Sequence, residues 1–205
     1  MTQTQAPKFE FTGGRLCLDF VNTVDNRNSP SRVDQIGTYD NLLAWAQQAA
    51  IVSTEQAQAL RKAAHNNPRD EQTATMHAVA LRECMFAIFA AIARGQPASS
   101  SYLERFNRTL RDAGGSRGLV SEGGRFRWKW ITPPGHLEWI LWPIVLDAAE
   151  LLLSQDLSLM RECAAQTCGW LFVDHSKNHR RRWCDMKVCG NRDKARRYYA
   201  RARAD

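Results

Sequence analysis

The spacing of hydrophobic residues along the chain predicts a mostly helical protein. Apolar side chains recur at three- and four-residue intervals in residues 15–24. The longest predicted helix covers residues 70–94, and its second half is apolar on nearly every side. We therefore place this helix at the centre of a helical bundle. Further helical segments are expected at about residues 38–50, 53–67, 100–112 and 137–153.

Local signals refine these elements. Ser53 and Gln56 form a capping-box pattern, and Pro143 should kink the helix at 137–153 or break its first turn. Residues 118–121 and 125–131 flank Gly123-Gly124 and read as a β-hairpin. The first part of the chain is therefore expected to be a helical domain with a small hairpin.

Charge and cysteine content change abruptly near residue 160. Residues 1–160 contain 16 Lys and Arg against 16 Asp and Glu, whereas residues 161–205 contain 12 against 5. The whole formal charge of +7, and four of the six cysteines, therefore belong to the C-terminal segment. We predict two domains, at residues 1–158 and 159–205.

The C-terminal cysteines have the spacing of a metal site. Four residues separate Cys163 from Cys168, and four separate Cys184 from Cys189. Fifteen residues lie between the two pairs. Two such pairs supply the four tetrahedral ligands that a structural Zn²⁺ requires, with no open position for water or substrate. The sequence therefore predicts a four-cysteine zinc finger that ends in a basic helix.

Other interpretations of these cysteines remain open. The thiols could be buried without metal or form a disulfide, and His175 or His179 could replace a cysteine ligand. The N-terminal residues lack the apolar core of a secretory signal, and no apolar run has the length of a membrane span, so we expect a cytoplasmic protein without a membrane partner. Thiols stay reduced there, which favours metal binding. Cys17 and Cys84 are expected to be small core residues.

The finger also carries a dense set of basic residues. A helix is expected from Arg192 to about Arg203, following Gly190-Asn191. Arginine suits phosphate recognition because its planar guanidinium binds two oxygens at once. The predicted nucleic-acid contacts are Arg180, Arg181, Arg182, Lys187, Arg192, Lys194, Arg196, Arg197, Arg201 and Arg203. The alternative is a solvated charge run that serves only solubility.

These motifs resemble the CGNR zinc-finger family. The name-giving Cys189-Gly190-Asn191-Arg192 is intact, and Cys168-Gly-Trp-Leu-Phe172 and Trp183-Cys184-x-Met186 also match. The opening Gly14-Arg-Leu-Cys-Leu-Asp19-Phe-Val-Asn22-Thr23 and Leu141-Trp-Pro143 resemble the ABATE domain that usually precedes this finger. The resemblance implies a bacterial transcription regulator induced by stress, with Cys163, Cys168, Cys184 and Cys189 as zinc ligands.

Polar residues interrupt the apolar helices of the first domain, at Asp19, Asn22, Arg82 and Glu83. A buried charge must be paired or bound to a ligand, because isolation costs several kcal/mol. One hypothesis is a pocket formed by these four residues together with tryptophans 128, 130, 139 or 142, which binds a small organic anion. The alternative is an internal ion pair of Arg82 with Asp19 or Glu83.

The leading functional hypothesis is a DNA-binding transcription regulator, in which the helical domain senses a ligand or forms a homodimer. The same basic surface could instead bind RNA or the ribosome, or an acidic protein, and the first domain could act as a small-anion sensor. The sequence shows no Ser/His/Asp set, no phosphate-binding glycine loop and no open metal site, so we do not expect an enzyme.

Overall fold

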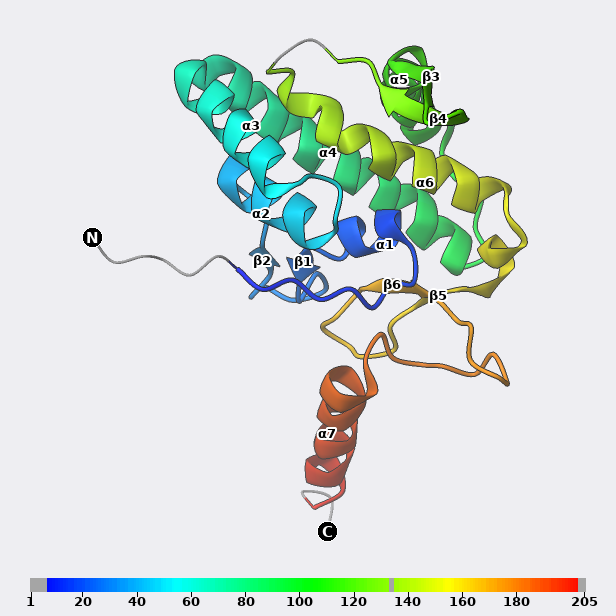
Figure 1. Cartoon of the computed structure of the whole chain (residues 1–205). Coiled ribbons are helices and arrows are strands. Elements are labelled where there is room, and N and C mark those ends of the chain that lie inside the picture. The colour runs from blue at the N-terminus through cyan, green and yellow to red at the C-terminus, as the bar shows by residue number, and fades with distance from the viewer. Residues whose placement is uncertain (1–6, 133–134, 203–205) are drawn as a thin grey trace.

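The computed structural model describes residues 7–132 and 135–202. A bundle of helices forms the body, a hairpin lies at one end, and a zinc-finger segment projects from the opposite side and ends in a helix (Figure 1). This confirms the predicted fold class. The helices of the body are α1 (Leu16–Val21), α2 (Tyr39–Gln48), α3 (Thr54–Asn66), α4 (Pro68–Ala93), α5 (Ser100–Gly115) and α6 (Trp142–Leu153).

The predicted start signals of the helices are confirmed. Thr38 accepts a hydrogen bond from the Asn41 backbone N–H at the start of α2, and Ser53 and Gln56 form a reciprocal capping box at the start of α3. Pro143 lies in the first turn of α6, after the 3₁₀ turn η1 (Leu137–Leu141), so the predicted helix at 137–153 is broken where proline was expected to break it. α5 extends through Gly114-Gly115, three residues beyond the segment predicted at about residues 100–112.

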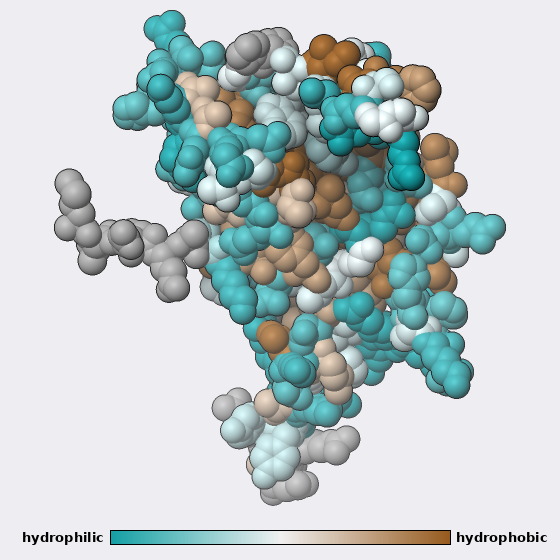
Figure 2. Space-filling model, in the orientation of Figure 1, coloured by the Kyte–Doolittle hydropathy of each residue, from teal (hydrophilic) through white to brown (hydrophobic). Residues whose placement is uncertain are grey.

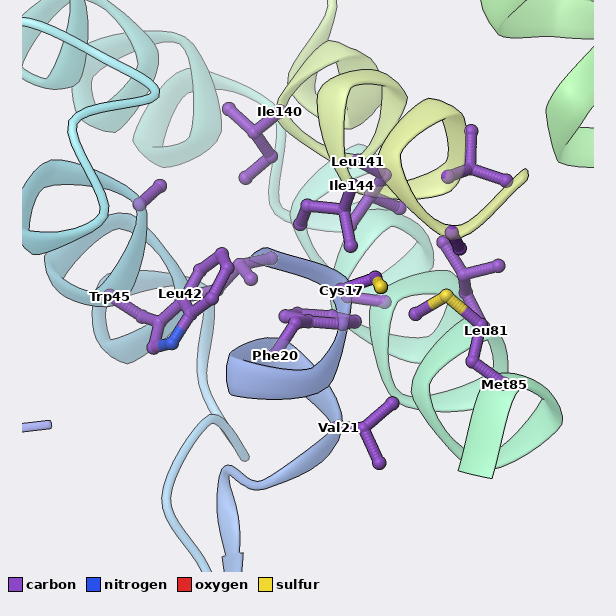
Figure 3. Packing of buried hydrophobic residues seen from close by; sticks show 14 of the residues in the cluster. Cys17, Phe20, Val21, Leu42, Trp45, Leu81, Met85, Ile140, Leu141 and Ile144 are labelled. Atoms are coloured by element: carbon purple, nitrogen blue, oxygen red, sulfur yellow. The ribbon is translucent and has the colours of Figure 1, made fainter. Parts of the chain in front are cut away.

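α4 is the central helix, as the apolar pattern predicted. It packs against α1, α2, α3 and α5. Its buried residues include Leu81, Met85 and Ile88. Figure 3 shows Leu81 and Met85 beside Cys17 and Phe20 of α1. α4 is also long and apolar enough to cross a membrane, which corrects the prediction that no segment has that character. A core helix passes the same test, and 44% of its most apolar window is buried in the fold.

The strands form three small antiparallel sheets. β1 (Val24–Asp25) pairs with β2 (Val33–Asp34), and the predicted hairpin is confirmed as β3 (Arg117–Glu122) and β4 (Arg125–Trp130). Gly123 and Gly124 both have positive φ, as a tight two-residue hairpin turn requires. The apolar side chains of this hairpin are largely exposed, and Figure 2 shows hydrophobic surface in the same region.

The third sheet joins the finger to the body. β5 (Met160–Glu162) pairs with β6 (Leu171–Val173), after the 3₁₀ turn η2 (Gln155–Leu159). Met160, Leu171 and Val173 are fully buried in the same hydrophobic core as the helices. Phe172 points the other way, into a second cluster formed by the cysteines and Trp170. The sheet of β5 and β6 therefore packs one face against the core of the body and the other face against the cysteine cluster.

Candidate zinc centre and basic surface

The four C-terminal cysteines converge on one point. All four are buried, and their Sγ atoms lie within 4.8 Å of one another. The Sγ atom of Cys184 is 3.7 Å from that of Cys168 and 3.6 Å from that of Cys189. A tetrahedral zinc ion with Zn–S bonds of about 2.3 Å separates its sulfurs by about 3.8 Å, whereas a disulfide needs about 2.05 Å. The geometry fits a structural Zn²⁺ and excludes disulfide pairing of these thiols.

Backbone turns hold each cysteine pair in place. Gly169 follows Cys168 with a φ of +74°, and a Cβ atom there would lie 3.1 Å from the side chains of Arg27 and Asn28. In the second pair, the Asp185 side chain accepts a hydrogen bond from Val188 N–H, at the start of the π-helical turn η3 (Met186–Gly190). The sequence predicted this pairing of the ligands but not the turns that produce it.

Asp174 organises the segment between the two pairs. Its carboxylate accepts hydrogen bonds from the backbone N–H and hydroxyl of Ser176 and from the backbone N–H of Arg181. Burial alone would raise the pKa of Asp174, but these hydrogen bonds outweigh it and hold the pKa below its ordinary value. Asp174 is not among the predicted site residues, although an acidic residue between polar turn residues is typical of such a loop.

The two histidines of the finger lie outside the cysteine cluster. His175 contacts Asp156 at 3.0 Å, and Nδ1 of His179 lies 2.8 Å from the Asp174 carbonyl oxygen. Both side chains are exposed. The four cysteines therefore form the ligand set without a histidine.

α7 (Asn191–Arg201) follows the last cysteine directly and projects away from the body (Figure 1). Its first turn is fixed by Asp193, which is buried and pairs with Arg196 at 3.0 Å and with Arg197 at 3.1 Å. Tyr198 and Tyr199 are 70% and 65% exposed, so these rings do not pack back onto the cysteine cluster.

Most of the predicted nucleic-acid contacts are exposed, and these exposed residues all belong to the region of the chain from residue 180 to residue 197. We call this region the basic surface; it comprises Arg180, Arg182, Lys187, Arg192, Lys194, Arg196 and Arg197. The side chain of Arg201 is not described, and Arg203 lies outside the described residues.

Arg181 differs from its two neighbours. Its guanidinium lies over the Phe172 ring at 4.3 Å and donates hydrogen bonds to the carbonyl oxygens of Thr12, Trp183 and Cys184. These bonds use Nε and one terminal nitrogen of Arg181 inside the protein, so we leave Arg181 out of the basic surface, and its predicted contact with nucleic acid stays a prediction. Arg181 ties the finger to the N-terminal segment.

Within residues 7–132 and 135–202, the four polar residues predicted to line a pocket each bind other groups of the protein. Asn22 donates to the Leu171 carbonyl oxygen at 2.8 Å and accepts from the Leu171 N–H at 2.9 Å, so its amide docks β6 onto α1. Arg82 is completely buried and binds both carboxylate oxygens of Asp34 at 2.6 Å. It also contacts Glu83, one of the two alternatives predicted, whereas Asp19 is not its partner.

Glu83 links this ion pair to the finger. Its second carboxylate oxygen pairs with Arg27, whose backbone N–H donates to the carbonyl oxygen of Cys168 at 3.0 Å. Burial would raise the pKa of Glu83, but the hydrogen bond and charge of Arg27 outweigh it, so the pKa lies below its ordinary value. A continuous network thus runs from α4 to the first cysteine pair.

Asp19 accepts a hydrogen bond from Gly13 N–H at 2.7 Å and is 8% exposed. Burial raises the pKa of this carboxyl to about 6, although the Gly13 bond opposes the rise. Since the folded state holds the proton more tightly than the unfolded chain, folding stability should fall between about pH 4 and pH 6 and then level off. This loss amounts to about 2–3 kcal/mol.

Asp19→Asn should remove this part of the pH dependence, because an amide can still accept the Gly13 bond without ionising. Urea unfolding of the wild type and the variant between pH 4 and pH 7 measures the difference. Parallel stability profiles of the two proteins would show that Asp19 ionises in the folded state as it does in the unfolded chain.

Comparisons with known families agree with this architecture. The family model ABATE, described as "Putative stress-induced transcription regulator", matches residues 14–155. The CGNR zinc finger matches residues 160–202 and includes all four cysteines. Neither is a family of enzymes, and a search of curated proteins gave no match. The chain belongs to the ABATE family, and its ABATE region is followed by a CGNR zinc finger with a structural zinc site.

Proposed function

We propose that this protein is a cytoplasmic DNA-binding transcription regulator whose zinc finger presents the basic surface to the phosphate backbone. The observation that carries the proposal is the segregation of charge. The whole +7 excess belongs to residues 161–205, and all seven residues of the basic surface are exposed. Clustered Lys and Arg on one face are the electrostatic feature of proteins that bind nucleic acid.

The shape of α7 supports this role. Its eleven residues extend about 16 Å, and the helix stands clear of the body (Figure 1). The DNA major groove admits one helix of this width. Lys194 lies on the exposed side, and Arg192 makes only long contacts, at 3.3 Å to Asn26 and 3.4 Å to Thr167. These two cations can turn to phosphates without breaking a strong ion pair.

RNA binding is the second candidate function. The observation that favours it is the exposure of Tyr198 and Tyr199 next to the arginines of α7. Exposed aromatic rings stack on unpaired bases, which are accessible in single-stranded loops but not in a DNA duplex. Competition between a DNA duplex and a structured RNA of equal length separates the two candidates. Preference for the RNA at every salt concentration would favour the second.

Salt dependence provides a test of the phosphate contacts. If about five phosphates are neutralised, the slope of log K against log salt on B-DNA is about −4.5. The double variant Arg192→Gln/Lys194→Gln should reduce the magnitude of this slope by about 1.8, because each phosphate contact contributes about 0.9. Fluorescence anisotropy of a labelled duplex at several salt concentrations measures both slopes.

The matched control is Lys62→Gln/Arg69→Gln. It removes one lysine and one arginine from exposed positions on α3 and α4, so it changes the net charge equally. We expect its slope to equal that of the wild type. If the two double variants behaved alike, binding would reflect overall charge and not the basic surface.

A further inference from the structure

A cavity of about 680 Å³ lies between α4, α5 and the segment from His136 to Trp142. This volume is within the range of small-molecule sites in proteins. Its floor is apolar and includes Leu81, Leu141 and Trp142. None of the four polar residues that the sequence pointed to lines it. The cavity is thus a separate feature of the helical domain.

Two arginines on α5 form the cationic side of the cavity. Arg105 and Arg108 are three residues apart, so they lie on the same face of the helix and both line the cavity. Neither takes part in an ion pair within 4.0 Å in the part of the chain that the structure describes. Burial raises the pKa of the Cys84 thiol in the cavity wall, and the charges of Arg105 and Arg108 oppose that rise. Both positive charges therefore act on the cavity interior.

The remaining polar side chains of the cavity differ in whether they can still bind a ligand. Glu138 is engaged by the imidazole of His77, whose Nδ1 atom lies 3.0 Å from the carboxylate. Asp112 lines the cavity one turn beyond Arg108 and can accept a hydrogen bond from a ligand. The centroids of the His136 and Trp142 rings lie 5.1 Å apart and the ring planes are tilted by 38°, so both rings contribute aromatic surface to the cavity wall.

We propose that this cavity binds a small aromatic carboxylic acid. The carboxylate lies against the two free guanidinium groups, the ring packs on the wall of Trp142 and His136, and a ring hydroxyl or amine donates to Asp112. Charge-assisted hydrogen bonds from arginine to a carboxylate are the strongest polar contacts such a site can offer. This inference concerns the helical domain and stands apart from DNA binding by the finger.

Calorimetric titration of the full zinc-loaded chain with 4-hydroxybenzoate tests the proposal. We expect saturable binding at one site, with 4-hydroxybenzyl alcohol, which lacks the carboxylate, at least about tenfold weaker. Arg105→Gln/Arg108→Gln should weaken 4-hydroxybenzoate binding by a factor of about ten or more, because a hydrogen bond between charged groups contributes about 1.5–3 kcal/mol.

Arg69→Gln/Arg111→Gln is the control, since both residues are exposed and neither lines the cavity. It should bind 4-hydroxybenzoate as the wild type does. Absence of saturable binding at millimolar 4-hydroxybenzoate, equal affinity for the alcohol, or equal affinity of the two double variants would each overturn the proposal. Thermal unfolding of each variant without ligand establishes that the fold is retained, as the exposure of Arg105 and Arg108 leads us to expect.

Discussion

Cys184→Ser is expected to abolish stoichiometric zinc binding and to lower the thermal stability of the whole chain. The Sγ atom of Cys184 lies close to those of both Cys168 and Cys189, so its loss removes a central ligand of the cluster. Structural zinc contributes about 10–16 kcal/mol in isolated finger peptides, which is more than the total stability of most domains. Without the metal, the four thiols lose the bonds that join one cysteine pair to the other.

The effect should reach the helical body because the two parts share a core. Leu171 and Val173 of the finger are buried among the helices, and the Leu171 backbone is held by the side chain of Asn22. Zinc content and the midpoint of thermal unfolding are the two measurements. Cys84→Ser is the matched control, since this thiol lies outside the cluster and donates only to the Tyr102 carbonyl oxygen. A Cys184→Ser protein with one equivalent of zinc and an unchanged midpoint would contradict the assignment.

Arg82→Met is expected to destabilise the protein by about 3 kcal/mol, the lower end of the cost of removing one partner of a buried ion pair, because the Asp34 side chain is 32% exposed and water partly solvates it. Arg82 is 0% exposed and is the main partner of Asp34 on β2. Burial would raise the pKa of Asp34, but the hydrogen bonds and charge of Arg82 outweigh it and keep the pKa below its ordinary value. Methionine has nearly the volume of arginine, so the loss of stability reflects the lost ion pair and not a new cavity.

The surface pair of Arg61 and Asp40 provides the comparison. Its N–O distance of 2.7 Å is close to that of the buried pair, but its side chains are 48% and 69% exposed. Arg61→Met should therefore cost less than about 1 kcal/mol. Urea unfolding of both variants measures the two losses. Equal losses of stability in the two variants would mean that the buried Arg82 contributes no more to the stability of the protein than the exposed Arg61 does.

The sequence was sufficient for features that depend on local spacing. Capping residues, the apolar face of α4, the Gly123-Gly124 turn and the break at Pro143 are local signals, and each produced the expected element. The cysteine pairs were also identified, because metal geometry requires paired ligands at short intervals.

Features that depend on distant partners were not predictable in the same way. Arg82 was expected to need a counterion, but Asp34 is 48 residues away in the chain, and no periodicity connects them. Asn22 looked like a ligand-binding residue because an amide in an apolar helix is unusual, yet its partner is the backbone of Leu171. Arg181 has the same sequence context as Arg180 and Arg182, and only its tertiary contacts turn it inward.

We expect zinc to organise the basic surface for nucleic-acid binding. The most direct measurement is the anisotropy of a labelled DNA duplex titrated with the full chain as purified, after removal of zinc by a chelator, and after zinc is restored. We expect tight binding at low salt, its loss on chelation, and its recovery with one equivalent of zinc. Equal affinity of the zinc-loaded and zinc-free protein for the duplex would contradict the account.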